Sequence, residues 1–170
     1  SEELVIALME PRGVLVHDVP DDYLGGHATN AIRARQLAAS LAVELEKRQN
    51  GEAAASLKIV CIVDDYDILS AGGTGPLQPL LPYLASAKDL NLNVFLTRPV
   101  AGAARAMFEN TIQSIKDTGG TGIILSGERA EGALWPGVHA SQAVPGRAKL
   151  VRRGHTPRLI QIANRGATDA

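Results

Sequence analysis

The most constraining feature of the sequence is an apolar run that ends in two acidic residues, Ile59-Val60-Cys61-Ile62-Val63-Asp64-Asp65. A run of this length is typical of a strand that is buried on both faces of a parallel sheet. In open α/β sheets, ligands bind at the carboxyl ends of such strands. We therefore expect Asp64 and Asp65 at a ligand-binding edge; the alternative is that they only cap the turn that follows the strand.

Apolar runs and helix-forming segments alternate along the rest of the chain. Strands are expected at residues 4–9, 92–97, 123–125, 148–151 and 159–163, and helices at 31–49, 76–89 and 103–117. Such alternation predicts βαβ crossovers and therefore an α/β fold with a mostly parallel sheet flanked by helices. It predicts one domain over 1–164 and a polar tail at 165–170.

Three shorter segments carry local signals. Thr29 or Asn30 is expected to cap the first long helix, because short polar side chains accept hydrogen bonds from free N–H groups at a helix start. Residues 13–16 predict a short strand or an extended connection. Residues 18–26 contain Pro20, three aspartates and two adjacent glycines, which indicates a surface loop.

Composition narrows the class of protein. With 170 residues, 45% hydrophobic and 21% charged, the chain can bury a core as a globular domain. A net charge of -1 and 4% aromatic residues argue against nucleic acid as a partner. The single cysteine, Cys61, excludes an internal disulfide and is expected to be a small core residue. No apolar stretch of membrane-spanning length and no secretory leader is visible, so a cytoplasmic location is expected.

The phosphate-binding loop of nucleoside triphosphatases is missing from the sequence. That loop requires Gly-Lys-Ser/Thr after a strand, and none of the five lysines follows a glycine. The segments Gly72-Gly73-Thr74-Gly75 and Gly119-Gly120-Thr121-Gly122 lack the lysine and are interpreted as turns. By itself the chain is therefore not expected to hold a triphosphate.

Several longer segments together resemble the FtsK/SpoIIIE-type ATPases of type VII (ESX) secretion, the EccC family, and most of all the carboxyl-terminal ATPase domain of that family. The segments that carry the resemblance are 19–24 with 28–29, 63–67, 79–84, 87–89, 102–108, 125–127 with 131–132, and 145–151. The resemblance as a whole extends over nearly the entire chain.

The resemblance implies a RecA-like P-loop NTPase core that lacks its amino-terminal Walker A strand and loop. It implies that Asp64 contacts Mg²⁺, that Asp65 takes the neighbouring acidic position, and that Thr97 is the polar sensor of the γ-phosphate. Asp65 departs from the usual glutamate and has a shorter reach. Arg98 and Arg105 match positions where an arginine faces the nucleotide of a neighbouring subunit; the alternative for both is a solvated loop or helix residue. The cofactors would be ATP and Mg²⁺ in the complete domain, with none bound by this chain alone.

The implied function is ATP binding or hydrolysis coupled to the export of secreted proteins. The implied partners are other ATPase domains of the same motor, secreted ESX-type substrates, and a membrane core reached through the parent protein. Two alternatives stay open: a non-catalytic module that binds substrates or partners, and, less favoured, an FtsK-like DNA translocase. Because the Walker A strand would be central in the sheet, we expect the isolated chain to be marginally stable or to form a homo-oligomer.

Overall fold

The computed structural model describes residues 3–73 and 75–163. They form two compact units, Ser1–Arg98 and Pro99–Ala170. The polar tail expected at 165–170 lies outside the described residues, as does Thr74 of the first glycine-rich segment. Among the helices of the described part of the chain, none combines the length and the apolar character that a membrane span requires.

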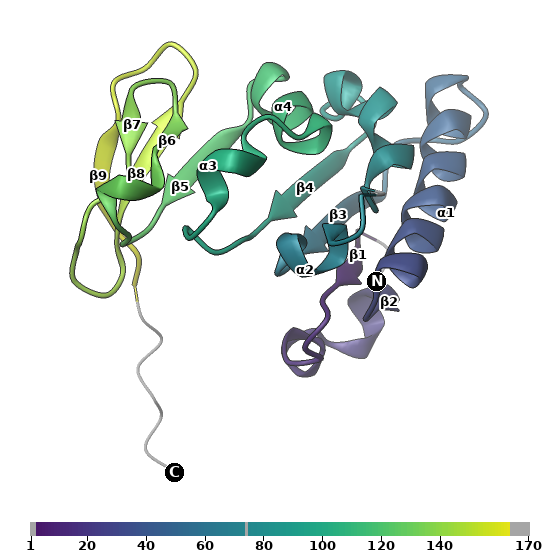
Figure 1. Cartoon of the computed structure of the whole chain (residues 1–170). Helices are drawn as coiled ribbons and strands as arrows, with labels where there is room; N and C mark the ends of the chain where they lie inside the picture. The colour runs from purple at the N-terminus through teal and green to yellow at the C-terminus, as the bar shows by residue number, and fades with distance from the viewer. Residues whose placement is uncertain (1–2, 74, 164–170) are drawn as a thin grey trace. The chain divides into compact units, whose positions relative to one another are not determined.

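A four-stranded parallel sheet forms the base of the first unit (Figure 1). Its strands are β1 (Leu4–Met9), β2 (Leu24–Ala28), β3 (Lys58–Val63) and β4 (Leu92–Leu96), in the order β2-β1-β3-β4. Met9 pairs with Val63, and Val63 pairs with Leu96. The last residues of the three neighbouring strands thus lie side by side. The predicted parallel α/β core is confirmed.

The centre of this sheet is the apolar core of the first unit. Ala7, Leu8 and Met9 of β1 are all buried, and so are Ile59 and Val63 on β3. Cys61 also lies in this core, as predicted, and its burial raises the pKa of the thiol to about 12. A thiol so rarely ionised is an inert core side chain.

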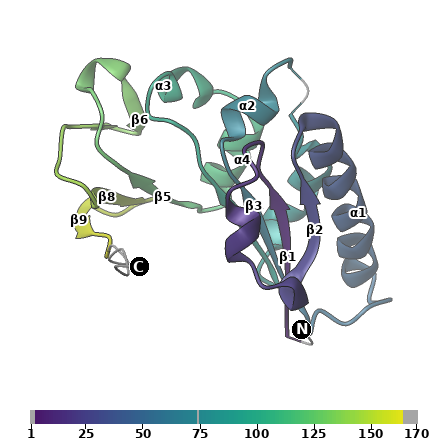
Figure 2. The same ribbon diagram turned by 90° about the horizontal axis from the view of Figure 1, so that it is seen from below.

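Helix α1 (Ala31–Gln49) coincides with the helix expected from the sequence and packs beside β2 (Figure 2). The Asn30 side chain caps it by accepting a hydrogen bond from the Arg33 N–H at 3.0 Å. Small residues, Ala34 and Ala38, are buried on its inner face. Small side chains on that face let the helix and the sheet approach closely.

Strand β2 and the turns before it are corrections to the sequence interpretation. Gly25 and Gly26, which indicated a loop, lie in β2. Glycine is required at both positions because the neighbouring side chains leave no room for a Cβ atom. A Cβ atom on Gly25 would lie 2.2 Å from Val5 Cγ2, and one on Gly26 would lie 2.7 Å from Leu37 Cδ1. The chain between β1 and β2 forms two 3₁₀ turns, η1 (Leu15–Asp18) and η2 (Asp21–Tyr23), instead of a strand or extended connection at 13–16.

The helix expected at 76–89 is also different in the structure. Residues Gln78–Ser86 form a 3₁₀ helix, η3, because Pro79 and Pro82 have no N–H to donate within an α-helix. A short helix, α2 (Tyr66–Ser70), follows the two aspartates and had no clear signal in the sequence.

The second unit contains short helices and antiparallel sheets. Its helices are α3 (Ala103–Ala106), α4 (Asn110–Asp117) and the 3₁₀ turn η4 (Arg129–Glu131). Its strands are β5 (Thr121–Ile124), β6 (Ala133–Trp135), β7 (Val138–His139), β8 (Arg147–Arg152) and β9 (Arg158–Gln161), arranged as β5-β8-β9 and β6-β7. The expected helix at 103–117 is split in two, and the expected parallel pairing is replaced here by antiparallel pairing.

Candidate functional site

Polar side chains gather where the parallel strands of the first unit end. Glu10 follows β1, Asp64 and Asp65 follow β3, and Thr97 and Arg98 follow β4. Because the strands are parallel and in register, these residues belong to one edge of the sheet. This is the edge at which α/β sheets bind ligands.

Thr97 joins the two aspartates. Its hydroxyl donates a hydrogen bond to Asp64 Oδ1 at 2.5 Å and accepts one from the Asp65 N–H at 3.2 Å. The Thr97 carbonyl accepts from the Tyr66 N–H at 3.0 Å, and the Thr97 N–H donates to the Val63 carbonyl at 2.9 Å. The structure therefore brings together three residues that the sequence had singled out, and it fixes one oxygen of the Asp64 carboxylate.

Asp65 occupies an unusual backbone conformation between β3 and α2. Its φ is 47° and its ψ is 50°, a left-handed conformation that aspartate tolerates better than most residues. Its carboxylate Oδ2 accepts a hydrogen bond from Arg12 Nε, and the two groups form an ion pair. Sequence reasoning missed Arg12. The available signal was its position in the turn just after the apolar run that forms β1, a strand that pairs with β3.

Arg98 carries unpaired donors. Its Nε and Nη1 atoms are buried and have no hydrogen-bond partner among the described residues. A buried guanidinium without partners carries an energetic cost, which an anion with several acceptor oxygens would relieve. The role predicted for Arg98, to face the nucleotide of a neighbouring subunit, stays a prediction. Arg105, the other arginine of interest, is exposed on α3 of the second unit.

Glu10 is a second residue that sequence reasoning missed. It is fully buried, and its carboxylate accepts hydrogen bonds from the N–H groups of Val14 (2.9 Å), Leu15 (2.8 Å) and Val16 (2.8 Å). His27 Nε2 lies 3.3 Å from Oε1. Burial alone would raise the pKa of Glu10, but the three N–H donors and His27 outweigh it and lower the pKa. Glu10, in its ionised form, thus holds the turn that follows β1.

The donor set at this edge suits a magnesium ion that is shared with a nucleotide. No three His, Cys, Asp or Glu side chains cluster closely enough to hold a metal ion within residues 3–73 and 75–163. Mg²⁺ in nucleotide sites, however, takes one or two carboxylates and completes its octahedral shell with water and phosphate oxygens. Asp64, anchored through Oδ1, and the unpaired donors of Arg98 meet those requirements for a metal and a phosphate.

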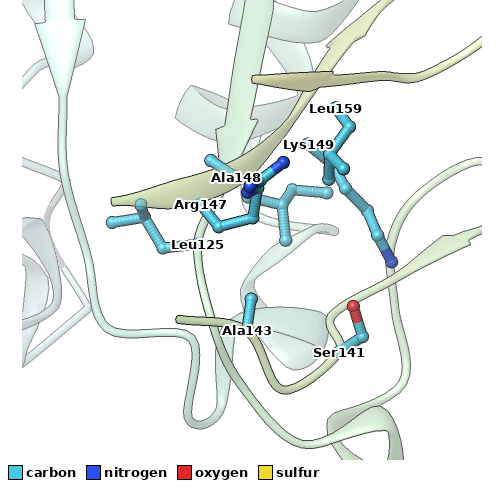
Figure 3. A pocket seen from close by; sticks show the side chains of 8 residues that line it. Leu125, Ser141, Ala143, Arg147, Ala148, Lys149 and Leu159 are labelled. Carbon is cyan, nitrogen blue, oxygen red and sulfur yellow. The ribbon is translucent and has the colours of Figure 1, made fainter. Parts of the chain in front are cut away.

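A shallow pocket lies in the second unit (Figure 3). Its cavity volume is about 20 Å³, and its lining residues are Ile124, Leu125, Ser141, Ala143, Arg147, Ala148, Lys149 and Leu159. This volume is below the roughly 300–1,000 Å³ of typical small-molecule sites. The pocket includes none of the strand-end aspartates, so it is not the predicted nucleotide site.

Comparison with curated proteins identifies relatives over part of the chain, although no family model matches it. The ESX-4 secretion system protein EccC4 of Mycobacterium tuberculosis is 39% identical over 105 residues, which is 62% of this chain. The ESX secretion system protein EccC of Thermomonospora curvata is 37% identical over 108 residues, or 64% of this chain. In each case the match spans 8% of the length of the curated relative.

Solved structures match the fold over nearly the whole chain. The structure of T. curvata EccC (ATPases 2 and 3) in complex with a signal sequence peptide has a TM-score of 0.84 and 26% identity, and the match covers 96% of this chain and 31% of that one. The cytoplasmic domain of the T. curvata type VII secretion ATPase EccC has a TM-score of 0.85 and 27% identity, with coverage of 96% and 20%. The cytoplasmic domain of EssC, at 16% identity and a TM-score of 0.63, supports the fold alone.

Proposed function

The chain is homologous to EccC ATPase domains, and on that premise we propose that it is a motor module of a type VII secretion system. In this module, nucleotide binding at the carboxyl edge of the parallel sheet is coupled to protein export. The observation that carries the proposal is the hydrogen-bonded set of Thr97, Asp64 and Asp65 at that edge. Relatives in sequence and in structure are EccC proteins, which agrees with this assignment.

Each residue of the edge has a role in this proposal. Asp64 holds Mg²⁺, which neutralises phosphate charge when bound. Thr97 fixes the orientation of Asp64 and would be the polar sensor of the γ-phosphate. Arg98 donates to phosphate oxygens, which pairs its buried Nε and Nη1 atoms. Asp65 takes the neighbouring acidic position, but its side chain is one methylene shorter than the usual glutamate, so it is not assigned the role of orienting the attacking water.

The sequence contains no Gly-Lys-Ser/Thr. We therefore propose that this chain alone does not hydrolyse ATP; the phosphate-binding loop either belongs to further sequence of a parent protein or has been lost by degeneration. The match to only 8% of each curated relative agrees with a module that acts as part of a larger machine.

The partners follow from the relatives. The T. curvata structure holds EccC ATPases 2 and 3 with a signal sequence peptide. For the parent of this chain we propose neighbouring ATPase domains and secreted substrates as partners. We also propose a location at the cytoplasmic face of the membrane, with the secretion core reached through other parts of the parent protein.

The decisive experiment is Mg-ATP binding to the complete domain, in which the parent's phosphate loop is restored. Asp64→Ala should weaken binding at least about tenfold, as loss of a metal-positioning group does. Asp89→Ala, which removes an exposed carboxylate of the same unit, is the matched control. Isothermal titration calorimetry measures both variants. Equal affinities would remove Asp64 from the site.

A non-catalytic binding module is the other function considered from the sequence. Titration of the complete domain with Mg-ATP, and separately with the terminal helix of a secreted substrate, separates the two functions. Peptide binding by a complete domain that has no affinity for Mg-ATP would favour the binding module. The printed descriptions of the solved relatives as ATPases favour the motor module.

A further inference from the structure

The turn between β1 and η1 is held rigidly at one point and carries a charged side chain at another. Glu10 fixes the turn through the N–H groups of residues 14–16. Arg12 lies between the anchor and these donors, so its backbone has little freedom to move. Its side chain is different, because 64% of it is exposed to solvent. An anchored backbone that carries a solvent-exposed side chain suits a group that makes and breaks a contact.

That side chain reaches across 53 residues of sequence to Asp65. The hydrogen bond to Asp65, and the charges of Asp65, Asp64 and Asp67, raise the pKa of Arg12. Asp67 contributes a buried Oδ1 atom that has no partner in the described part of the chain. Arg12 is therefore the positive charge that faces the acidic group at the end of β3.

We infer that Arg12 is a positioning residue that acts as an internal counter-ion and competes with a divalent cation for the carboxylates that follow β3. The inference rests on the proposed function, since it takes Asp64 as the magnesium position. While Arg12 binds Asp65 Oδ2, that oxygen is not available to a water molecule or to a metal-bound water. Entry of a cation repels the guanidinium, and Arg12 then releases Asp65. Arg12 thus keeps the acidic edge neutralised until the cation arrives.

The test is the binding of Mn²⁺, a spectroscopic probe for Mg²⁺, at low salt to the complete domain, in which the phosphate-binding loop is restored, because this chain alone is not expected to hold the metal. Arg12→Gln removes the competing charge and should tighten Mn²⁺ binding roughly two- to fivefold, the scale of an exposed ion pair. Arg35→Gln removes an exposed arginine on α1 and controls for net charge. Arg12→Lys keeps the charge and should remain within about twofold of the original affinity. Electron paramagnetic resonance measures free Mn²⁺, and urea unfolding shows that each variant is folded.

A double-mutant cycle with Asp65→Asn provides a second readout. Asp65→Asn leaves Arg12 without its partner and should weaken Mn²⁺ binding, whereas the addition of Arg12→Gln should restore it. In the unmodified chain, Mg²⁺ should also shift the nuclear magnetic resonance signal of the Arg12 Nε–H group. Equal Mn²⁺ affinity for Arg12→Gln and Arg35→Gln overturns the inference, as does the absence of saturable binding in every variant.

Asp64→Asn separates a failure of this inference from a failure of the proposed function. If Asp64→Asn abolishes Mn²⁺ binding while Arg12→Gln behaves like its control, only the role of Arg12 is wrong. If Mn²⁺ binds equally well without the Asp64 carboxylate, the metal position itself is wrong, and both proposals fall.

Discussion

The two units differ in where the polar residues that follow their strands are placed: at one edge of the sheet in the first unit and at both ends of the sheet in the second. In the first unit all four strands run parallel, so Glu10, Asp64 and Thr97 follow strands that end at the same edge. In the second unit β8 runs antiparallel to β5 and β9. Residues that follow β5 and β8, such as Ser126 and Arg153, therefore belong to opposite ends of that sheet. Within residues 3–73 and 75–163, it is the parallel unit that brings acidic residues from separate strands to one edge of a sheet.

The polar groups of the two units therefore have different roles. The first unit holds a hydrogen-bonded set of acidic and hydroxyl groups, which suits a metal and a phosphate. The polar groups described in the second unit mostly stabilise its turns: Glu131 Oε2, for example, accepts from the Gly102 N–H at 2.7 Å. The second unit has its own small core of Ile124, Leu134 and Val151. A unit with its own core can lose stability without disturbing the other.

The strongest way to break this comparison is to create a cavity in each core. Leu45 in α1 is 0% exposed and Leu134 in β6 is 6% exposed. Leu45→Ala and Leu134→Ala should each cost about 2–5 kcal/mol of unfolding free energy. Native-state hydrogen exchange should show lost protection in the first unit for one variant and in the second unit for the other. Equal loss in both units from either variant would show one cooperative structure instead of two.

The next prediction concerns the anchor of the polar edge. Glu10→Ala leaves three part-buried N–H donors without their acceptor and should cost about 3 kcal/mol. Glu46→Ala, at an exposed position on α1, should change stability by less than about 0.5 kcal/mol. Urea unfolding measures both variants. If the two lose equal stability, Glu10 is not the anchor.

Glu10 also predicts the response of the first unit to acid. Its pKa in the folded state is lowered from 4.5, so the folded protein holds the carboxylate more readily than the unfolded chain does. Its stabilising contribution is complete above about pH 4.5 and is lost as the pH falls through the lower, folded-state pKa. Stability measured between pH 3 and pH 6 should therefore decrease more steeply in the unmodified chain than in Glu10→Gln. Parallel curves would contradict this contribution.

Gly25 tests why β2 is a strand. Gly25→Ala places a Cβ atom against Val5 Cγ2 and should cost about 1–3 kcal/mol. Val5→Ala removes that methyl group, so the double variant should be more stable than the sum of the two single changes predicts. Thermal unfolding measures all three variants. Strict additivity would mean that the two residues do not compete for the same space.

The same glycines show what the sequence could reveal of the fold. Strong local signals were sufficient for β1, β3, β4 and α1, because apolar runs and helix periodicity act within a few residues. Strand β2 was missed because its glycines are required by Val5 and Leu37, which are distant in sequence. The antiparallel pairing of β5 and β8 was missed for a similar reason, since strand direction depends on the connections between strands.

For the candidate site, the sequence located the residues but not all of their contacts. Asp64, Asp65 and Thr97 were predicted from strand ends and from the family resemblance, and the hydrogen bonds of Thr97 bring the three together. Their catalytic roles stay predictions. Arg12 and Glu10 gave no motif, because their contacts depend on a turn whose shape is set by the buried carboxylate itself. Hydrogen bonds between one side chain and the turn that follows it leave no recognisable pattern in the sequence.

The smallest expected effect comes from the cap of α1, a helix that belongs only to the first unit. Asn30→Ala removes the acceptor for the Arg33 N–H and should cost about 1 kcal/mol. Asn30→Asp keeps an acceptor and adds a negative charge at the helix start, so it should retain the original stability. Ser40→Ala, in the exposed middle of the same helix, should be neutral or slightly stabilising, because alanine has the higher helix propensity. Urea unfolding with hydrogen exchange should confine the Asn30→Ala loss to the first unit. If protection from exchange were also lost in β5 and β8, the start of α1 would contribute to the stability of the antiparallel sheet. The two units would then differ in topology but not in their stability.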